Sequence, residues 1–262
     1  MKLDGCTALV TGGSAGLGEE FARQLAPRAR VLVLVARRQE RLEQVRAEFQ
    51  QRYSQLEVHI RAVDLADASQ LNQLAQSLEK IEIDFLVNNA GLGDYGSIAT
   101  SDVERVDRMI DVNVRAVTLL TRFLLPRMIA RKRGAILNVS SSAAFLPIPG
   151  MAIYAATKAY VNSFTEALRV ELRGKGISVT ALCPGPVSTE FGDVAARPGG
   201  KPETAPDFVY VSAADVVRES LLALEANRPL VIPGVLMKLG MLLVRITPMP
   251  VLRFVTRFRV NR

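Results

Sequence analysis

Residues 7–25 read TALVTGGSAGLGEEFARQL and carry three patterns in a row. Thr7 to Val10 is a short apolar run, and the segment that ends at Leu25 has the apolar spacing of a helix. Between them, glycines in the pattern G-x-x-x-G-x-G allow a tight turn and a close approach of the backbone to a pyrophosphate group. The amino end of the following helix favours negative charge. The stretch therefore predicts a strand, a phosphate-binding turn and a helix, with a turn that binds nothing as the alternative.

Apolar runs of strand length alternate with helical patterns along the rest of the chain. The expected strands cover residues 7–10, 31–35, 58–63, 83–87, 135–139, 177–182 and 230–232, and the expected helices cover residues 37–52, 69–78, 102–131, 154–173 and 212–225. Such alternation is typical of parallel strands joined by right-handed crossovers. The predicted fold class is therefore α/β, a Rossmann-like, doubly wound parallel sheet of about seven strands with helices on both faces.

Three local features refine this prediction. Pro126 lies inside the longest helical pattern and predicts a kink or an early end of that helix. Ser69 is the expected cap of the helix that begins there. Residues 184–206 are rich in proline and glycine and indicate a long loop, of the kind that is either functional or disordered.

The chain has 33 basic and 26 acidic residues among 262, and the basic excess has one location. No Asp or Glu follows Glu225, whereas the last 37 residues contain seven Lys and Arg. The charges of the body therefore balance. This argues against a nucleic-acid partner and for a local basic element at the end of the chain.

Cysteine and histidine are scarce. Cys6 and Cys183 stand without a C-x-x-C pattern, and His59 is the one histidine in the sequence. This inventory argues against a metal site and against a Ser-His-Asp triad. The N-terminus runs into a strand without the apolar stretch of a signal peptide, so we expect a reducing, cytoplasmic environment.

The strongest candidate for chemistry is the stretch Tyr154-Ala155-Ala156-Thr157-Lys158. In a helix, its tyrosine and lysine lie one turn apart on the same face. A cation near a phenol lowers the pKa of the phenol and makes it a better acid–base catalyst. Ser141 follows an apolar strand and can bring a hydroxyl to the same point, with Ser140 and Ser142 as the alternatives. Together these groups can exchange a proton with an oxygen whose carbon gains or loses a hydride; a helix start with a surface lysine is the alternative.

The end of the second expected strand indicates which dinucleotide fits. An acidic residue there would accept hydrogen bonds from a ribose 2′-hydroxyl, but the sequence reads Ala36-Arg37-Arg38. Arginine can pair with a 2′-phosphate, so we predict NADPH over NAD, with two solvated arginines as the alternative. Asp64 ends the third strand and is expected either to hold the adenine amino group or to cap a helix.

A set of motifs occurs in a fixed order across residues 7–189. These are Thr11-Gly12-x-x-x-Gly16-x-Gly18, Asp64-Leu65, Asn88-Asn89-Ala90-Gly91, Asn113, Ser141, Tyr154-x-x-x-Lys158 and Pro184-Gly185-Pro186-Val187-Ser188-Thr189. In this the sequence resembles the short-chain dehydrogenase/reductase family. Ala15 departs from the family pattern, because NADP-preferring members often have a basic residue there. The resemblance implies an NAD(P)-dependent oxidoreductase without a metal, acting on a carbonyl compound or a secondary alcohol.

The resemblance also implies a role for four catalytic residues. Tyr154 is the general acid–base residue, and Lys158 lowers the pKa of Tyr154 and binds the nicotinamide ribose. Ser141 holds the substrate oxygen. Asn113 supports a water-mediated proton relay to Lys158.

The remaining matches are expected at the cofactor. Asn88 lies beside the ribose, and Val187 and Thr189 hold the nicotinamide carboxamide. The other expected cofactor residues are Gly12, Ser14, Gly16, Leu17, Gly18, Arg37, Arg38, Asp64, Leu65, Ala90, Gly91, Pro184 and Gly185.

Residues 1–233 are expected to form one NAD(P)-binding catalytic domain, and residues 234–262 a basic amphipathic extension. In the extension, Lys238 and Arg245 share one helical face, and no apolar run reaches the roughly 20 residues of a transmembrane helix. The extension could contact an anionic membrane, cover a lipophilic pocket, pack on another subunit, or be disordered.

Our main hypothesis from the sequence is an NADPH-dependent reductase of a hydrophobic ketone. The alternative is an NADP(H)-binding regulatory or interaction protein that has kept the fold without turnover. The resemblance implies a small-molecule substrate and a homodimer or homotetramer.

Overall fold

The computed structural model describes residues 2–197 and 206–257, whose strands and helices alternate along the chain. The strands are β1 (Thr7–Thr11), β2 (Val31–Ala36), β3 (Glu57–Ala62), β4 (Phe85–Asn88), β5 (Gly134–Val139), β6 (Ile177–Leu182) and β7 (Leu230–Val231). The α-helices are α1 (Gly16–Leu25), α2 (Gln39–Arg52), α3 (Ala68–Ser77), α4 (Val103–Ile110), α5 (Val117–Arg131), α6 (Ala152–Glu171), α7 (Phe191–Ala195), α8 (Ala213–Glu225), α9 (Val235–Ile246) and α10 (Met249–Arg257). A π-helix, η2 (Asp111–Ala116), joins α4 to α5, and short 3-10 turns form η1 (Ile98–Thr100), η3 (Ser142–Phe145) and η4 (Asp207–Val209).

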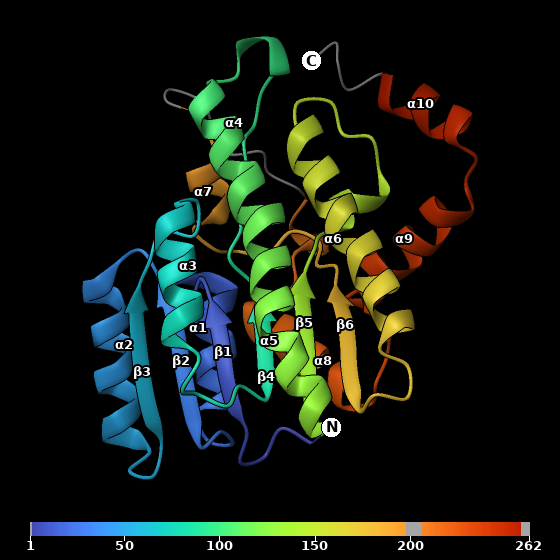
Figure 1. Cartoon of the computed structure of the whole chain (residues 1–262). Helices are drawn as coiled ribbons and strands as arrows, with labels where there is room; N and C mark the ends of the chain where they lie inside the picture. The colour runs from blue at the N-terminus through green and yellow to red at the C-terminus, as the bar shows by residue number, and fades with distance from the viewer. Residues whose placement is uncertain (1, 198–205, 258–262) are drawn as a thin grey trace.

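The described strands form one parallel sheet in the order β3-β2-β1-β4-β5-β6-β7 (Figure 1). The order reverses beside β1, which pairs with β2 on one side and with β4 on the other. Such a reversal opens a crevice at the carboxyl ends of the central strands, where α/β proteins bind ligands. The predicted fold class, a doubly wound parallel sheet, is confirmed.

Helices cover both faces of the sheet, and this explains why the central strands are buried runs without alternation. On one face, α1, α2 and α8 contribute core residues such as Phe21 and Phe49. On the other face, α3, α5 and α6 contribute core residues such as Leu124 and Leu168. The sheet is therefore the middle of three layers, as Figure 1 shows.

The cap of α3 differs from the prediction. The side chain of Asp67, not of Ser69, accepts hydrogen bonds at the amino end of this helix, from the backbone N–H groups of Ser69 (2.8 Å) and Gln70 (3.1 Å). An aspartate at the N-cap also brings a negative charge to the positive end of the helix dipole, which a serine does not. The helix thus begins at Ala68, one residue earlier than expected.

The helix expected over residues 102–131 neither ends early at Pro126 nor runs uniformly. Pro126 lies inside α5, which continues to Arg131. The irregularity occurs instead at η2, whose π-helical turn separates α4 from α5 and contains Asn113. Short π-helical turns inserted in helices are frequent at functional sites.

The expected loop over residues 184–206 contains the short helix α7, and residues 198–205 lie outside the described part of the chain. Beyond β7, the extension forms α9 and α10. This extension, expected over residues 234–262, is described as far as Arg257.

Candidate active site

The glycine-rich turn between β1 and α1 lies at the carboxyl end of β1, beside the crevice. Gly12 and Gly16 have φ angles of 70° and 54°, which side chains disfavour. A Cβ at Gly12 would lie 2.7 Å from Asn89 Nδ2, and a Cβ at Gly18 would collide with the carbonyl oxygen of Gly12. The turn is therefore closed so tightly that only glycine fits at these positions.

The start of α1 is suited to an anion. Its N-cap residue, Ala15, offers no side-chain acceptor, whereas Asp67, Asp102 and Ser212 cap α3, α4 and α8. The first N–H groups of α1 are thus left for an external acceptor, which is the arrangement that binds phosphate. On this observation the turn fits the pyrophosphate of a dinucleotide. Of the other residues expected there, Ser14 is buried and Leu17 packs against the core.

Thr11 and Asn89 connect this turn to β4, and the sequence prediction assigned neither a role. Thr11 Oγ1 accepts hydrogen bonds from the N–H groups of Asn89 (2.9 Å) and Ala90 (3.0 Å) and donates to the carbonyl oxygen of Val87 (3.2 Å). Asn89 Nδ2 returns a bond of 2.8 Å to the carbonyl oxygen of Thr11. These bonds hold the ends of β1 and β4 together, so the threonine before the first glycine is a structural part of the motif.

The two arginines after β2 have different surroundings. Both are exposed, and Arg38 forms an ion pair of 3.0 Å with Glu190, which follows Thr189 in the β6–α7 segment. Arg38 also approaches the carbonyl oxygen of Ser14 at 3.4 Å. Within the described residues Arg37 has no ion-pair or hydrogen-bond partner, so its charge is available at the edge of the crevice.

Asp64 does not cap a helix, which was one of its two expected roles, because Asp67 caps α3. The Asp64 carboxylate accepts hydrogen bonds from Arg108 Nη2 (2.7 Å) and from the N–H group of Ala66 (3.0 Å). Burial raises the pKa of Asp64, but these hydrogen bonds outweigh burial and keep it below the usual range. The role expected for Asp64 at the adenine stays a prediction. The side chain of the neighbouring Leu65 lies in the core.

Ser141, Tyr154 and Lys158 meet where β5 ends and α6 begins. The Ser141 side chain acts on the Tyr154 hydroxyl as a hydrogen-bonding neighbour and lowers its pKa, and its Oγ accepts a bond of 3.1 Å from Ala143 N. Lys158 Nζ lies 5.8 Å from the centre of the Tyr154 ring and donates a hydrogen bond of 2.8 Å to the carbonyl oxygen of Val139. Ser140 faces the other way and donates to the carbonyl oxygen of Lys158 (2.8 Å), as strand geometry requires. Of the three serines, Ser141 is thus the one whose side chain acts on Tyr154.

Burial controls the protonation of this trio. It raises the pKa of Tyr154 to about 12, and the hydrogen bond with Ser141 acts in the opposite direction. It lowers the pKa of Lys158 to about 8. The sequence argument expects Lys158 to lower the pKa of Tyr154. In the structure burial dominates this pKa, and the group that lowers it is Ser141, not Lys158. Tyr154 therefore holds its proton at neutral pH, which is the form that can donate to a carbonyl oxygen.

Asn113 is fully buried in the π-helical turn η2 and grips the segment after β4. Its side chain accepts a hydrogen bond from Leu92 N (2.8 Å) and donates to Leu92 O (2.9 Å) and to Thr157 Oγ1 (3.0 Å). A Cβ at Gly91 would lie 3.2 Å from Lys158 Nζ and 3.4 Å from Asn113 Oδ1. Asn113 and Lys158 are thus close to each other across Gly91, and the water relay between them stays a prediction.

Asn88 does not face the ribose position that the resemblance implies. Its side chain is buried and donates hydrogen bonds to Thr121 Oγ1 (3.1 Å) and Asn138 Oδ1 (2.8 Å). Asn138 Nδ2 in turn donates to Thr165 Oγ1 (2.9 Å), which completes a buried polar chain across β4, β5 and two helices. Strand alternation explains the difference, because it turns the last side chain of β4 toward the α5 and α6 layer.

The segment after β6 packs against both the turn and the extension. Pro184 O accepts a hydrogen bond from Ser142 N (2.9 Å), and a Cβ at Gly16 would lie 3.3 Å from Thr189 Cβ. Val187 forms an isolated parallel bridge with Val211. A Cβ at Gly185 would collide with Met237 of α9. The expected nicotinamide segment is therefore near the glycine-rich turn, and α9 lies directly against it.

An ion-pair cluster around Asp94 holds α7 over the site, and the sequence did not reveal it. Asp94 is 5% exposed and pairs with Arg197 (2.7 Å), just after α7, and with Arg105 (3.1 Å) of α4. Arg105 Nη2 also donates to the carbonyl oxygens of Val194 (2.7 Å) and Ala195 (2.8 Å), at the end of α7. The Phe191 ring of α7 lies 5.5 Å from the Tyr154 ring. The cluster thus fixes the helix that covers Tyr154.

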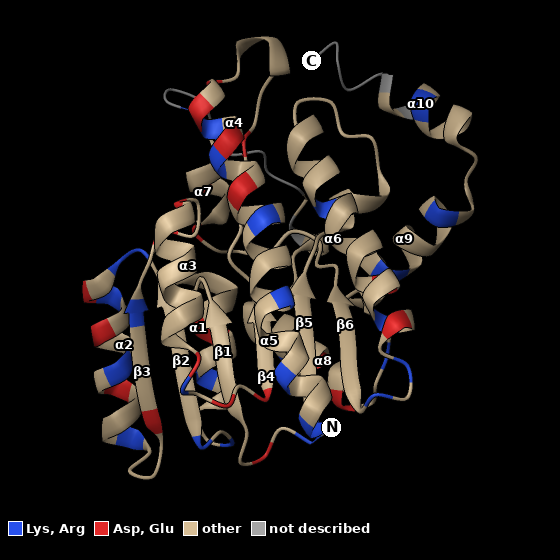
Figure 2. Cartoon of the chain, in the orientation of Figure 1, with Lys and Arg blue, Asp and Glu red and all other residues tan. Residues whose placement is uncertain are grey.

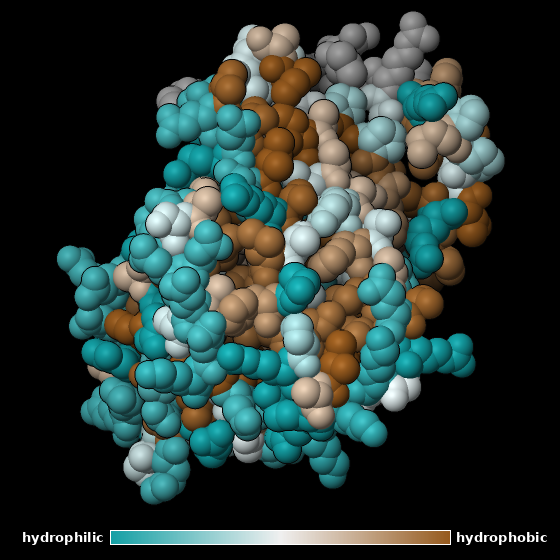
Figure 3. Space-filling model, viewed as in Figure 1, coloured by the Kyte–Doolittle hydropathy of each residue, from teal (hydrophilic) through white to brown (hydrophobic). Residues whose placement is uncertain are grey.

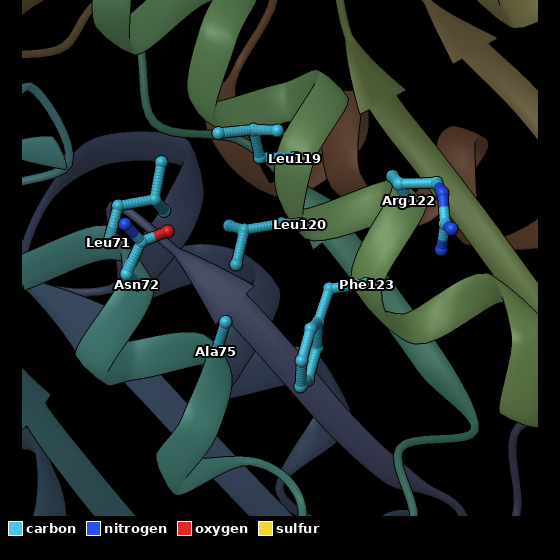
Figure 4. Close-up of a pocket in the computed structure, with 7 residues that line it drawn as sticks. All are labelled: Leu71, Asn72, Ala75, Leu119, Leu120, Arg122 and Phe123. Carbon is cyan, nitrogen blue, oxygen red and sulfur yellow. The ribbon is translucent and has the colours of Figure 1, made fainter.

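Other features carry no comparable chemistry. Burial raises the pKa of the Cys6 and Cys183 thiols to about 12, so neither is a nucleophile at neutral pH. Within residues 2–197 and 206–257, no three His, Cys, Asp or Glu side chains lie together in a way that could hold a metal. A pocket of about 180 Å³ between α3 and α5, lined by apolar side chains such as Leu120 and Phe123, contains none of the residues discussed above (Figure 4).

Comparison with known proteins places this site in a family. The family model described as short chain dehydrogenase matches residues 6–197. The chain belongs to that family. A short-chain dehydrogenase transfers hydride between a nicotinamide cofactor and its substrate, so this protein is an oxidoreductase.

Three short-chain dehydrogenases and reductases illustrate the relationship. The very-long-chain 3-oxoacyl-CoA reductase of Bos taurus is 36% identical over 214 residues, which are 80% of this chain and 68% of that protein. A short-chain dehydrogenase from Sphingobium yanoikuyae, solved in complex with NADPH, is 30% identical with a TM-score of 0.82 and covers 93% of this chain and 97% of its own. A member from Burkholderia phymatum, solved in complex with NAD, is 27% identical with a TM-score of 0.79 and covers 92% and 93%. Members similar to this chain thus bind either nicotinamide dinucleotide.

Proposed function

We propose that this short-chain dehydrogenase reduces a ketone carried on a long apolar molecule and uses NADPH. The observation that carries the proposal is Tyr154 inside an apolar cluster, with the Ser141 side chain acting on its hydroxyl. Tyr154 packs in one buried group with Met109, Ala143 and Met151, and Leu92, Ile148 and Phe191 lie around them. A protonated phenol in such surroundings suits a carbonyl oxygen whose carbon bears apolar substituents.

Two observations support NADPH. Arg37 and Arg38 follow β2, where NAD-binding proteins of this fold have an acidic residue. Arg37 is exposed and has no ion-pair or hydrogen-bond partner in the described chain, although its charge acts on Asp64, so pairing with a 2′-phosphate breaks no such bond. The carboxylate of Glu190 competes with the same phosphate for Arg38.

The chain's own residues divide the chemistry between them. The bound nicotinamide would supply the hydride. Ser141 holds the substrate oxygen by a hydrogen bond, and the Tyr154 hydroxyl gives that oxygen its proton. Lys158 brings a positive charge that stabilises the phenolate which remains. Asn113, by fixing Leu92 and Thr157, keeps α6 and the segment after β4 in register around this proton path.

The 3-oxoacyl thioesters are the first substrates to test, because the relative from Bos taurus is named for their reduction. NADPH absorbance is followed with 3-oxoacyl-CoA substrates of increasing chain length and with short polar ketones, and each is repeated with NADH. We expect turnover to rise with chain length and to be faster with NADPH. Turnover confined to short polar ketones, or faster with NADH, would contradict the proposal.

The matched variant is Tyr154→Phe, which removes one oxygen and keeps the ring packed on Phe191. We expect turnover to fall at least about 1,000-fold, within the range for a lost acid catalyst combined with a lost oxygen contact. NADPH binding, measured by fluorescence, should change less than about twofold. A variant that turns over at the wild-type rate would show that another group delivers the proton.

The proposal extends to assembly and environment. A homodimer or homotetramer is expected, and light scattering on the purified chain measures it. Free, buried Cys6 and Cys183 support a reducing, cytoplasmic environment.

A further inference from the structure

Helix α9 is apolar on two faces, and residues 2–197 and 206–257 cover only one of them. Met237, Met241 and Val244 recur at helical spacing and are its less exposed residues. They lie on the side that contacts η3, the turn just after Ser141, and Met237 touches Gly185. The inner face of α9 is therefore part of the wall around the candidate active site.

The outer face of α9 presents large apolar side chains to the surroundings. Its residues, with their exposed fractions, are Val235 (78%), Leu236 (53%), Leu239 (59%), Leu242 (58%), Leu243 (63%) and Ile246 (70%). Helix α10 continues this apolar surface with Met249 (48%), Val251 (49%) and Phe254 (63%). Half of the strongly exposed large apolar residues in the described chain thus fall within residues 235–254. A surface of this kind marks an interaction site.

The charges that α9 and α10 themselves carry have one sign, and Glu219 of α8 is an acidic neighbour that lines a pocket with Val235 and Lys238. Lys238 and Arg245, seven residues apart, lie along one edge of α9, and Arg253 is exposed on α10. No acidic residue follows Glu225. Figure 2 shows α9 and α10 with basic positions only, and Figure 3 shows hydrophobic and hydrophilic residues side by side where these helices lie, at the upper right. A second copy docked through the same face would bring the basic residues of α9 and α10 together, and neither helix has a carboxylate to pair with them.

We propose that the outer face of α9 and α10 docks this protein on an anionic lipid membrane. Apolar side chains flanked by Lys and Arg, in short helices, are the features of helices that lie in the membrane interface. In the described chain no helix is long and apolar enough to cross a bilayer, and α9 with its 12 residues is about 18 Å long. Docking would place lipid against the outside of a helix whose inside borders Ser141 and Gly185.

Flotation of the full-length protein with lipid vesicles tests the proposal. The wild-type protein should float with phosphatidylcholine vesicles that contain 30% phosphatidylserine and should float at least about fivefold less with pure phosphatidylcholine or in 0.5 M salt, since each surface charge contributes severalfold. Leu239→Gln with Leu243→Gln should lower vesicle binding about tenfold or more. Lys238→Gln with Arg253→Gln should lower it severalfold.

The matched control is Val170→Gln with Lys175→Gln, which alters an exposed apolar and an exposed basic residue at the far end of α6 and should float like the wild type. NADPH binding and thermal melting, measured for every variant, report on the fold independently of membrane binding and of any substrate. Wild-type protein that stays in solution with anionic vesicles, or outer-face variants that float as it does, would overturn the proposal. It would equally be overturned if those variants dissociated an oligomer and left flotation unchanged.

Discussion

Lys158 places an amine where little water reaches it, with 4% of its surface exposed. Its hydrogen bond to the Val139 carbonyl offsets only part of the cost, and burial lowers its pKa to about 8. A lysine with a lowered pKa destabilises the folded protein fully below the folded pKa, and this cost is relieved as the pH rises toward the unfolded value of about 10.4. Function, not stability, therefore accounts for the charge at this position.

The change Lys158→Met separates the effect of the buried charge on turnover from its effect on stability. Turnover should be lost, while the melting temperature should rise by a few degrees at pH 6.5, which corresponds to about 1–2 kcal/mol. At pH 9.5 the difference from wild type should be smaller, because part of the wild-type lysine is then neutral. Calorimetry at both pH values measures this, and an equal difference at both would show that the buried charge is not its cause.

At the scale of elements, α7 depends on the cluster around Asp94. The short helix has five residues and would hardly persist alone. Arg197 hydrogen-bonds Asp94 and holds the pKa of that carboxyl below its usual range, so the ion pairs persist above about pH 4 and weaken below it. Helix α7 is thus attached through electrostatic contacts that connect it to α4 and to the segment after β4.

The change Asp94→Asn should loosen α7 without touching the phosphate turn. Removing one partner of a largely buried pair is costly, and here about 1–3 kcal/mol is reasonable because both arginines keep some solvent contact. We expect KM for the ketone to rise about tenfold and hydrogen exchange to accelerate in residues 191–197, with NADPH binding unchanged. Asp111→Asn, which removes only an exposed pair with Arg115, is the control. If KM and hydrogen exchange were unaltered, the cluster around Asp94 would not be what holds α7 in place.

At the scale of the molecule, the chain Thr121–Asn88–Asn138–Thr165 joins the two middle strands to α5 and α6. Asn138 is its centre and is fully buried. The change Asn138→Ala removes two buried hydrogen bonds, one from Asn88 Nδ2 and one to Thr165 Oγ1, and weakening each buried polar group costs about 1–3 kcal/mol. Asn88 keeps its bond to Thr121, and Thr165 keeps its bond to the carbonyl oxygen of Val161. The free energy of unfolding in urea should fall by about 2–4 kcal/mol, and the exposed Asn72→Ala should leave it unchanged. A wild-type denaturation midpoint for the buried variant would contradict this.

The sequence predicted the architecture well because the alternation of strands with helices and the spacing of the glycines are local signals. It placed Ser141 beside Tyr154 for the same reason, since one ends a strand and the other begins a helix. It missed Glu190 opposite Arg38 and Arg197 opposite Asp94, because such pairs join residues that are about 100 or more apart. It misplaced Asn88 because a motif gives the identity of a residue but not the side of the sheet to which it turns.

The π-helical turn η2 contains one residue more than an α-helical turn would need, and this bears on how a deletion would affect the active site. A π-turn accommodates one residue more than an α-turn, because its hydrogen bonds span i to i+5 in place of i to i+4. Deleting one residue there would restore an α-turn and leave α4 and α5 with the same faces toward the sheet. The position of Asn113 would be lost, and Val112 and Ala116 of the same turn, which pack in the core, would have to shift. A one-residue deletion in η2 should therefore cost the active site Asn113 and oblige the core to repack locally.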